Sequence, residues 1–441
     1  MAKIMPFKGF RYHTDKIKDI AHVVCPPYDI ISPEAQERYY QLHDHNMIRV
    51  ELGKDLPEDT PSNNRYTRAA AYLADWQRQG FLIQNQVPSL YLYMMSYLHP
   101  QEGPKTLKGF LTLVQLEDPE TRRILPHEWT FPKAKHDRLQ LLRACHANTS
   151  PIFSLYSDPD NQVMARLEKS VNGAKPHNSF VGEDEIQHRL WIVSDPGVQR
   201  AVAEQLKDQP LFIADGHHRY ETALNFRNEM RVGSPDSPKP YDRVLMFLTG
   251  MNDPGISLMP IHRVILNPLP CDVRTLQERL RKTFEIIPLP FTERNEPEIR
   301  RQLFQEMRRS ESTKTVFGMY SQGEQGYQLL ILKEDARPAS APSRPGRPVD
   351  RLDVAIFRRC VLQEALGMED VAAKKEGLIQ FIKDEDAAIR AVRSGTAGAA
   401  FFLNATRVDQ VREVVLSGDR MPQKSTYFYP KPLTGLVLNI F

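Results

Sequence analysis

The chain has 441 residues, which is enough for two to four domains and for a hydrophobic core that needs no disulfides or structural metals. Its 58 Lys and Arg residues nearly balance 55 Asp and Glu residues, and this argues against a nucleic-acid-binding or membrane-surface protein. No apolar stretch is long enough to span a bilayer, the N-terminus lacks the apolar core of a signal peptide, and no two of the four cysteines form a Cys-x-x-Cys pair. We therefore expect a cytoplasmic protein that has no membrane anchor.

The first 160 residues are predicted to form a mixed α/β domain. Residues 66–80 carry an apolar stripe at helical spacing and end at a glycine, which predicts a helix. Residues 88–98 and 108–116 are rich in Tyr, Leu, Thr and Val, which predicts two strands. A short helix is expected at 139–145, after a polar segment with no amphipathic pattern.

The middle of the chain shows the clearest pattern. Asp195 precedes a proline and suits a helix cap, so a helix is predicted over 196–206. Residues 211–214 and 244–248 read as short buried strands. The first of these strands leads directly into a glycine and a helix over 216–230, which predicts a strand–turn–helix unit.

The remaining residues alternate between strand and helix patterns. Residues 256–332 predict strand, helix, strand, helix and hairpin, with helices at 272–283 and 296–308 and the hairpin turn at 322–326. Residues 337–348 are rich in Pro, Ser and Arg, which predicts a mobile linker.

The last 90 residues carry three predicted helices, at 353–366, 384–394 and 406–417, and two strands, at 399–403 and 436–440. The predicted fold class is therefore α/β, in the mixed α+β sense, with a core and additional α/β subdomains. The expected segments are an N-terminal α/β domain at 1–160, the core with the strand–turn–helix unit at 161–265, a small α/β subdomain at 266–336, a flexible linker at 337–350 and a C-terminal α/β segment at 351–441.

The motif DGHHRYETA, which begins at residue 215, indicates an anion site. It follows a buried strand and opens a helix, so the free N–H groups and the positive end of the helix dipole meet at this turn. Gly216 allows a ligand to approach the backbone closely, and Arg219 can grip phosphate oxygens through two parallel hydrogen bonds. His217 and His218 add further donors, although their side chains point about 100° apart on a helix and do not suit one metal ion together.

Asp215 is the unexpected member of this motif, because a carboxylate repels phosphate. It could take a proton from an attacking hydroxyl, or hold a Mg²⁺ ion that bridges the phosphates. The structural alternative is that Asp215 caps the helix while Arg219 pairs with a nearby acid. We assign Asp215 and His218 as candidate catalytic residues, and Gly216, His217 and Arg219 as candidate phosphate ligands.

A second polar segment, LPHEWTFPKAKHDR at 125–138, carries both signs of charge. Such a loop suits a site that binds an anion and moves a proton, although a solvated charged loop explains the pattern as well. Glu128 is the candidate second carboxylate, and Lys135 and Arg138 are candidate phosphate ligands.

Two further motifs contain candidate ligand-binding residues. In MPQKSTYFYPK at 421–431, Lys424, Ser425 and Thr426 carry phosphate-binding chemistry but lack the spacing of a Walker loop. In VVCPPYDIIS at 23–32, the two prolines aim the tyrosine and Asp29, which is either a metal ligand or a turn cap.

The motif DGHHR resembles the phosphate-binding box of the ParB/sulfiredoxin-like superfamily, most closely its free serine kinase branch. The whole chain resembles a large bacterial and archaeal family of unassigned function. The resemblance rests on four motifs in order: PPYD, LPHE with a following KxDR, DGHHRYETA and MPQKSTYFYPK. The resemblance implies a ParB/sulfiredoxin-like core and transfer of a phosphoryl group to a small-molecule hydroxyl such as that of free L-serine. It also implies a catalytic role for Asp215 and phosphate contacts from the four residues that follow it.

The leading hypothesis is therefore a small-molecule phosphotransferase that uses Mg²⁺ and a phosphate donor, with ATP, ADP and pyrophosphate all open. One alternative is a nucleotide-dependent ParB-like binding module, although nucleic acid is an improbable partner at this charge balance. Another is a metal-dependent phosphoesterase built from His127, Glu128, Asp215 and His217. A homodimer is an open alternative for the oligomeric state, and the identity of any metal ligands is unknown.

Overall fold

The computed structural model describes residues 3–130, 132–232, 238–311, 313–336, 346–368, 377–422 and 424–441. The chain divides into two compact units. Unit 1 comprises Met1–Pro126, Thr130–Ser257 and Phe428–Phe441, and unit 2 comprises His127–Trp129 and Leu258–Tyr427. Each unit is built around its own sheet.

The main sheet of unit 1 is mixed and runs in the order β6-β11-β8-β12-β5-β4-β10-β9, with β1 paired to β5. The pairs β11–β6 and β12–β8 are parallel, and the other pairs are antiparallel. The strands are β1 (Ile4–Met5), β4 (Leu90–His99), β5 (Gly103–Gln115), β6 (Ile124–Leu125), β8 (Ile152–Tyr156), β9 (Asn178–Val181), β10 (Gln187–Val193), β11 (Leu211–Asp215) and β12 (Arg243–Gly250). Two small sheets pair β2 (Phe10–Tyr12) with β3 (Leu82–Gln84), and β7 (Ala147–Asn148) with β21 (Asn439–Ile440).

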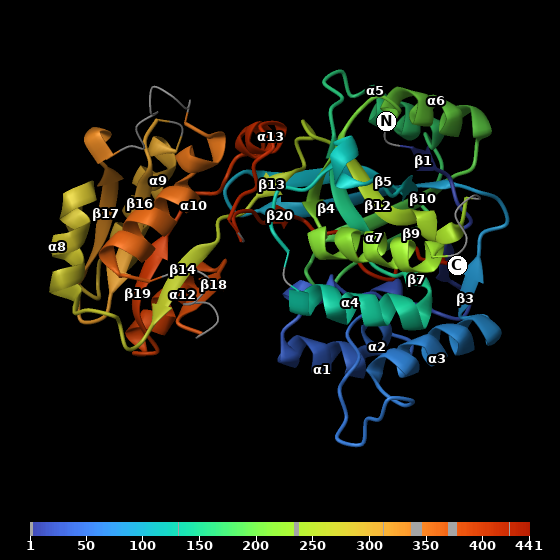
Figure 1. Cartoon of the computed structure of the whole chain (residues 1–441), viewed down its shortest axis with the longest axis horizontal. Helices are drawn as coiled ribbons and strands as arrows, with labels where there is room; N and C mark the ends of the chain where they lie inside the picture. The colour runs from blue at the N-terminus through green and yellow to red at the C-terminus, as the bar shows by residue number, and fades with distance from the viewer. Residues whose placement is uncertain are drawn as a thin grey trace. The chain divides into compact units, whose positions relative to one another are not determined.

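Apolar side chains on one face of this sheet pack with residues of three helices, α5, α6 and α7. The helix α4 packs along α7, and α3 lies against α4, so that helices are layered below the sheet in Figure 1. The helices of unit 1 are α1 (Pro33–Leu42), α2 (Ile48–Glu51), α3 (Arg65–Arg78), α4 (Pro132–Cys145), α5 (Gln162–Ser170), α6 (Pro196–Leu206) and α7 (His217–Arg231). In the first turn of α7, His217 and Tyr220 are buried, and the two residues between them are partly buried.

Unit 2 is built on an antiparallel sheet in the order β15-β17-β16-β19-β14-β18 (Figure 1). Side chains of α9 and α12 cover one face, and Phe357 of the π-helix η7 packs against Phe317 and Phe401 from the other face. The strands are β14 (His262–Leu266), β15 (Phe284–Pro290), β16 (Val316–Ser321), β17 (Gly326–Leu332), β18 (Ile379–Ile382) and β19 (Ala397–Phe402). The helices of unit 2 are α8 (Val273–Thr283), α9 (Glu296–Ser310), α10 (Asp353–Ile356), η7 (Phe357–Ala365), α12 (Glu385–Arg393) and α13 (Val408–Leu416). Two further short strands, β13 (Ser257–Leu258) and β20 (Phe428–Tyr429), pair with each other.

The structure confirms a mixed α/β fold with a large mixed sheet, and most of the predicted elements. One prediction was wrong: the polar segment at 125–138 is not all loop, because α4 begins at Pro132 and continues to Cys145. Proline suits the first helical turn, and polar side chains on this helix pair with neighbouring elements in place of forming an apolar stripe. Strands β8 and β10 and helices α1 and α5 were not predicted.

The five-segment division stays a prediction, although the expected boundary at residue 160 falls inside one sheet. Strands β4, β5 and β8 precede that boundary, whereas β10, β11 and β12 follow it and pair with them. Most of the expected linker, residues 337–345, lies outside the described residues. Within the described part of the chain, no helix is both long and apolar enough to cross a membrane.

A buried histidine in the core of unit 2 makes the stability of that unit sensitive to acid. His262 is 1% exposed, and its Nδ1 accepts a hydrogen bond from the Leu403 N–H at 3.3 Å. Its Nε2 is buried without a hydrogen-bond partner among the described residues. Burial, with a smaller contribution from the charge of Arg263, lowers the pKa of His262 from 6.5 to about 3.

We therefore expect unfolding in acid to depend on this side chain. The pKa of His262 is lower in the folded state than in the unfolded state. Neutral His262 therefore contributes fully to the free energy of unfolding above pH 6.5, and this contribution is lost as the pH falls towards 3. Between pH 7 and pH 5 the loss amounts to about 2 kcal/mol. His262→Asn keeps a hydrogen-bond acceptor but does not titrate, so its urea-unfolding free energy should vary less between these pH values. Equal pH dependence in the two proteins would contradict the assignment.

Candidate functional site

The strand–turn–helix unit predicted at residues 211–230 is present and ends with Asp215 at the edge of the sheet. Strand β11 pairs with β8 up to Asp215, with an irregularity between Ile213 and Asp215 that changes the register. Gly216 follows with φ 92°, and α7 begins at the next residue. The turn therefore places the Asp215 carboxylate at the amino end of a fifteen-residue helix.

Gly216 is required at this turn for two separate reasons. Its φ lies in the left-handed region, where side chains are strained. A Cβ at this position would also lie 3.1 Å from the guanidinium of Arg219. The sequence-based interpretation was that Gly216 makes room for a ligand; in the structure the neighbouring space is taken by Arg219.

Two buried cations bind the Asp215 carboxylate. Arg219 donates from Nη2 to Oδ2 at 2.7 Å, and Lys431 donates from Nζ to Oδ1. The side chains are 16% exposed for Asp215, 10% for Arg219 and 5% for Lys431, so these pairs are poorly screened. Burial raises the pKa of Asp215, but the charges of Lys431 and Arg219 outweigh it and hold that pKa well below its usual range.

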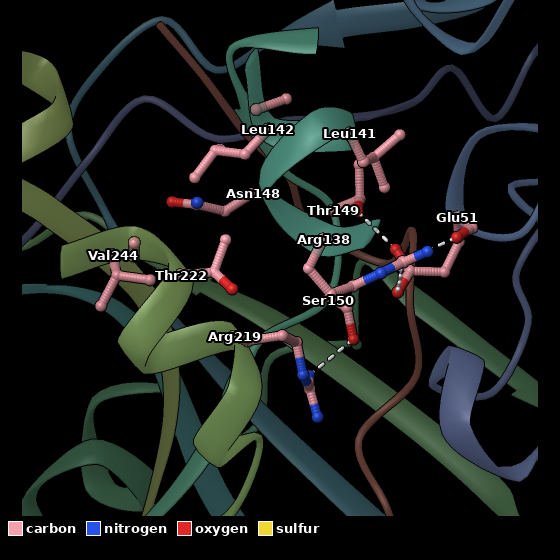
Figure 2. Close-up of a pocket in the computed structure, with 12 residues that line it drawn as sticks. Glu51, Arg138, Leu141, Leu142, Asn148, Thr149, Ser150, Arg219, Thr222 and Val244 are labelled. Carbon is pink, nitrogen blue, oxygen red and sulfur yellow. Dashed lines mark hydrogen bonds and ion pairs between the residues drawn. The ribbon is translucent and has the colours of Figure 1, made fainter. Parts of the chain in front are cut away.

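Arg219 also contacts the segment that follows α4. Its Nη1 donates to Ser150 Oγ at 2.7 Å and to the carbonyl of Pro151, while Nε is buried without a hydrogen-bond partner among the described residues. Arg219 lines a cavity of about 50 Å³ whose polar walls include Thr149 and Ser150, as Figure 2 shows. This volume accommodates roughly three or four water-sized groups.

The lining of the cavity also contains a buried ion pair between Arg138 of α4 and Glu51 (Figure 2). Arg138 Nη1 donates to the Glu51 carbonyl at 2.8 Å and to its Oε1 at 3.3 Å, and Thr149 Oγ1 donates to Glu51 Oε2 at 2.6 Å. Arg138 Nε donates to Asp137 at 2.8 Å, and its guanidinium lies 4.1 Å from the ring centre of Tyr28. The PPYD, KxDR and DGHHR motifs therefore meet in unit 1.

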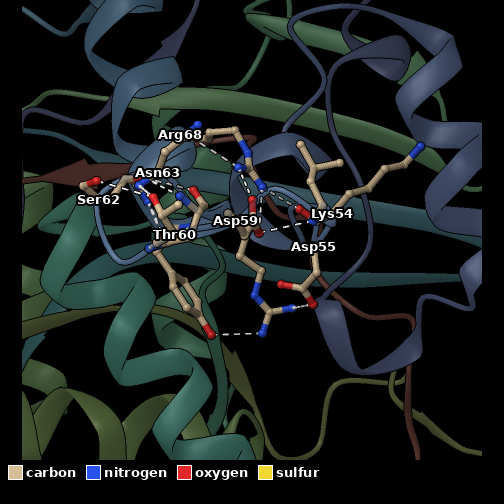
Figure 3. A network of polar contacts seen from close by, with 12 residues as sticks. Lys54, Asp55, Asp59, Thr60, Ser62, Asn63 and Arg68 are labelled. Carbon is tan, nitrogen blue, oxygen red and sulfur yellow. Dashed lines mark hydrogen bonds and ion pairs between the residues drawn. The ribbon is translucent and has the colours of Figure 1, made fainter.

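An outer layer of polar contacts holds α3 against this cluster. Asp137 accepts hydrogen bonds from Tyr66 at 2.8 Å and from Arg65, both in the first turn of α3. The loop before α3 is held in turn by Arg68, which donates to both oxygens of Asp59 at 2.5 and 3.2 Å (Figure 3). Asn64 caps the helix through its side chain. The orientation of Asp137, and through it of Arg138, thus depends on a chain of contacts from the N-terminal region.

The other predicted residues of unit 1 lie on or beside α7. Lys135 Nζ pairs with Glu221 Oε2 at 3.0 Å, so its charge is already matched. His217 is 7% exposed, and its charge is one of those that lower the pKa of Asp215. His218 is half-buried on the next position of the helix. Among the described residues, no group of three or more His, Cys, Asp or Glu side chains is placed to hold a metal ion.

The remaining predicted residues belong to unit 2. His127 Nε2 lies 2.9 Å from Thr426 Oγ1, and Thr426 donates to Glu128 Oε1 at 3.5 Å. Lys424 has φ 56°, and its carbonyl accepts from Arg263 Nη2 at 2.9 Å; Ser425 is buried and donates to the Pro422 carbonyl. The candidate residues therefore form one group in unit 1 and one in unit 2, and a joint role for Glu128 and Asp215 stays a prediction.

The sequence analysis missed several residues that the structure brings to Asp215 and Arg138. Lys431 was inside a quoted motif but was not selected, and Tyr28 was noted only for its position after two prolines. The four-residue spacing of Asp215 and Arg219 is a signal for their pairing. No local pattern marks Glu51 or Thr149.

A family model described as "Protein of unknown function (DUF1015)" matches residues 4–355. The chain belongs to the DUF1015 family. A search of curated proteins found no match for this DUF1015 protein.

Several solved structures resemble this DUF1015 protein at low identity. A free serine kinase mutant in complex with ADP is 13% identical, with a TM-score of 0.37, and the match covers 72% of this chain and 87% of the kinase. C-terminally truncated SbnI from Staphylococcus aureus is 11% identical, with a TM-score of 0.36 and coverage of 74% and 85%. A conserved hypothetical protein from Pyrococcus furiosus is 13% identical, with a TM-score of 0.35 and coverage of 74% and 93%. At these scores the similarity carries no argument about function or ligands.

The buried pair of Arg138 and Glu51 should matter for stability far more than an exposed pair on the same helix. We expect Arg138→Ala to lower the free energy of unfolding by about 3–5 kcal/mol, because Glu51 would remain buried without its partner. The control is Arg143→Ala in α4, which removes a pair with Glu229 that is about 40% exposed and should cost less than about 1 kcal/mol. Similar losses in urea unfolding for the two variants would contradict this.

A pair of glycine variants separates the two reasons why glycine is required at position 216, its positive φ and the close approach of Arg219. Gly103 also has positive φ, but no atom lies within 4 Å of its Cβ position, so Gly103→Ala should cost only the backbone strain of roughly 1–2 kcal/mol. Gly216→Ala should cost about 1 kcal/mol more, because Arg219 must move and lose hydrogen bonds. Thermal or urea unfolding measures the loss of stability in both variants. Equal losses would show that Arg219 can move away from a Cβ at position 216 without cost.

Proposed function

We propose that this protein is a phosphotransferase that moves a phosphoryl group from a nucleotide or pyrophosphate to the hydroxyl of a small molecule, such as free L-serine. One observation carries the proposal: at the amino end of α7, a single buried carboxylate is matched by two buried cations. The resemblance of the DGHHR motif to the phosphate-binding box of free serine kinases supports the same conclusion.

The electrostatics of this turn favour an anion. Asp215 contributes one negative charge and Arg219 and Lys431 contribute two positive charges, so these three side chains together carry one positive charge. The helix amino end adds about half a positive charge. Because the three side chains are buried, a phosphate group here would interact strongly with both cations, and the buried Nε of Arg219 offers a further donor.

Phosphate binding would also change the chemistry of Asp215. Phosphate oxygens compete with the carboxylate for Arg219 and Lys431, so a bound donor draws at least one cation away from Asp215. Its pKa would then rise towards the range in which a carboxylate accepts a proton from a hydroxyl. In this proposal, the donor both supplies the phosphoryl group and releases Asp215 to act as the base.

The residues at this turn do not form a ready Mg²⁺ site. Magnesium is held by carboxylate oxygens, water and phosphate, whereas both oxygens of Asp215 already accept hydrogen bonds from cations. We therefore derive no step that depends on Mg²⁺. Arg138 and Lys135 stay candidate phosphate ligands, although Arg138 is paired with Glu51 and Lys135 with Glu221.

Other roles remain as predicted from the sequence. His218 and Glu128 stay candidate proton-transfer groups, and Lys424, Ser425 and Thr426 stay candidate ligands for the donor. Neither the ParB-like binding module nor the metal-dependent phosphoesterase has a supporting observation among the described residues.

The direct test is to incubate the purified protein with L-serine, Mg²⁺ and ATP, ADP or pyrophosphate in turn, and to measure phosphoserine by mass spectrometry. We expect product with at least one donor. Arg219→Ala should abolish donor binding in calorimetry, and Asp215→Asn should reduce turnover more than donor binding. As a control, Arg143→Ala removes an exposed ion pair and should change neither donor binding nor turnover.

Absence of phosphoserine with all three donors would remove serine as the acceptor. Unchanged donor binding in Arg219→Ala would overturn the assignment of the anion site to this turn.

A further inference from the structure

Two motifs about 300 positions apart in the sequence are joined in unit 2. Residues 127–129 belong to this unit, although the residues on either side of them belong to unit 1. Glu128 forms a parallel β-bridge with Met421, and the Met421 N–H donates to the His127 carbonyl at 2.8 Å. The backbone of the LPHE segment is thereby fixed against the segment that carries Thr426.

The side chains of the two segments are connected through one hydroxyl. His127 Nε2 and Glu128 Oε1 are 3.9 Å apart, too far for a direct hydrogen bond. Thr426 Oγ1 lies 2.9 Å from His127 Nε2 and donates to Glu128 Oε1 at 3.5 Å. When the hydroxyl gives its one proton to Glu128, His127 carries its proton on Nε2 and donates to Thr426.

The backbone around Thr426 is held on its N-terminal side. Arg263 donates to the carbonyl of Lys424 at 2.9 Å, and Thr406 Oγ1 donates to the carbonyl of Ser425 at 2.9 Å. His127 is 1% exposed, so its ring has little freedom to turn. The hydroxyl therefore sits between a fixed donor and a carboxylate that is 19% exposed.

We propose that Thr426 is a positioning residue and not a ligand for the donor: its hydroxyl joins His127 to Glu128 and fixes the direction of the Glu128 carboxylate. This inference rests on the proposed function for the catalytic relevance of Glu128, the candidate second carboxylate. The hydrogen-bond chain itself is independent of that function. The contact between Thr426 and Glu128 is long, as is common for contacts that shorten when a ligand binds.

Two substitutions at position 426 separate the effect of the hydroxyl from the effect of the side-chain shape. Thr426→Val keeps the branched shape and removes the hydroxyl, whereas Thr426→Ser keeps the hydroxyl. In the phosphoserine assay, we expect Thr426→Val to lower kcat roughly tenfold or more with little change in KM for the donor, and Thr426→Ser to restore most of the loss. A kcat for Thr426→Val within twofold of the unmodified protein would overturn the positioning role.

A second measurement needs no activity. In the full chain carrying ¹⁵N-labelled histidine, with His127→Gln used to assign the signal, NMR should show His127 protonated on Nε2. The Nε2 shift should move in Thr426→Val and return in Thr426→Ser. An unchanged His127 signal in Thr426→Val would overturn the hydrogen-bond chain even if the valine variant is too unstable for kinetics.

The two measurements distinguish the possible failures. If the unmodified protein makes no phosphoserine while the His127 signal responds as expected, the proposed function fails and the hydrogen-bond chain stands. If the protein is active and neither kcat nor the His127 signal responds, the proposed function stands and the role of Thr426 fails.

Discussion

The candidate site of unit 1 depends on the contact between Asp215 and two cations, Arg219 and Lys431. A buried carboxylate at the edge of a sheet would be costly alone, and a single arginine would leave one of its oxygens without a charged partner. With the second cation, the three side chains together carry one positive charge, and this is the basis of the proposed anion site. This arrangement resolves the conflict noted from the sequence, in which a carboxylate stands where phosphate is expected.

The pairing of Asp215 with Arg219 also explains how the residues around them are arranged. Arg219 reaches Asp215 only by passing over Gly216, and it is held there by Ser150. In the lining of the cavity, Arg138 and Glu51 neutralise each other. The charges of Arg138 and Glu51 are therefore paired locally, whereas the proposed anion site is the group of Asp215, Arg219 and Lys431 at the amino end of α7. A ligand that binds there must exchange existing ion pairs for new ones, which favours groups of high charge density such as phosphate.

The parts of this site that could be predicted from the sequence are those determined by residues close together in the chain. The apolar run at 211–214, followed by a glycine and a helical pattern, was enough to predict the turn at Asp215. Lys431 lies 216 positions away from its partner, and its pairing depends on which segments the sheet brings together, which local patterns do not contain. The start of α4 was missed for a different reason: its polar side chains are used in ion pairs, so the first turns of the helix lack the apolar residues on which the prediction depended. Grouping Glu128 with Asp215 rested on residue type alone, and the two residues belong to different units.

Unit 1 is discontinuous, and this has a consequence for how the protein is made. The segment Phe428–Phe441 carries Lys431 and is translated only after the whole of Leu258–Tyr427 has been synthesised. Until then, a nascent chain can form the Asp215–Arg219 contact but not the Asp215–Lys431 contact. Completion of the proposed anion site is thus a late event in biosynthesis, and a polypeptide released early would lack one of its two cations.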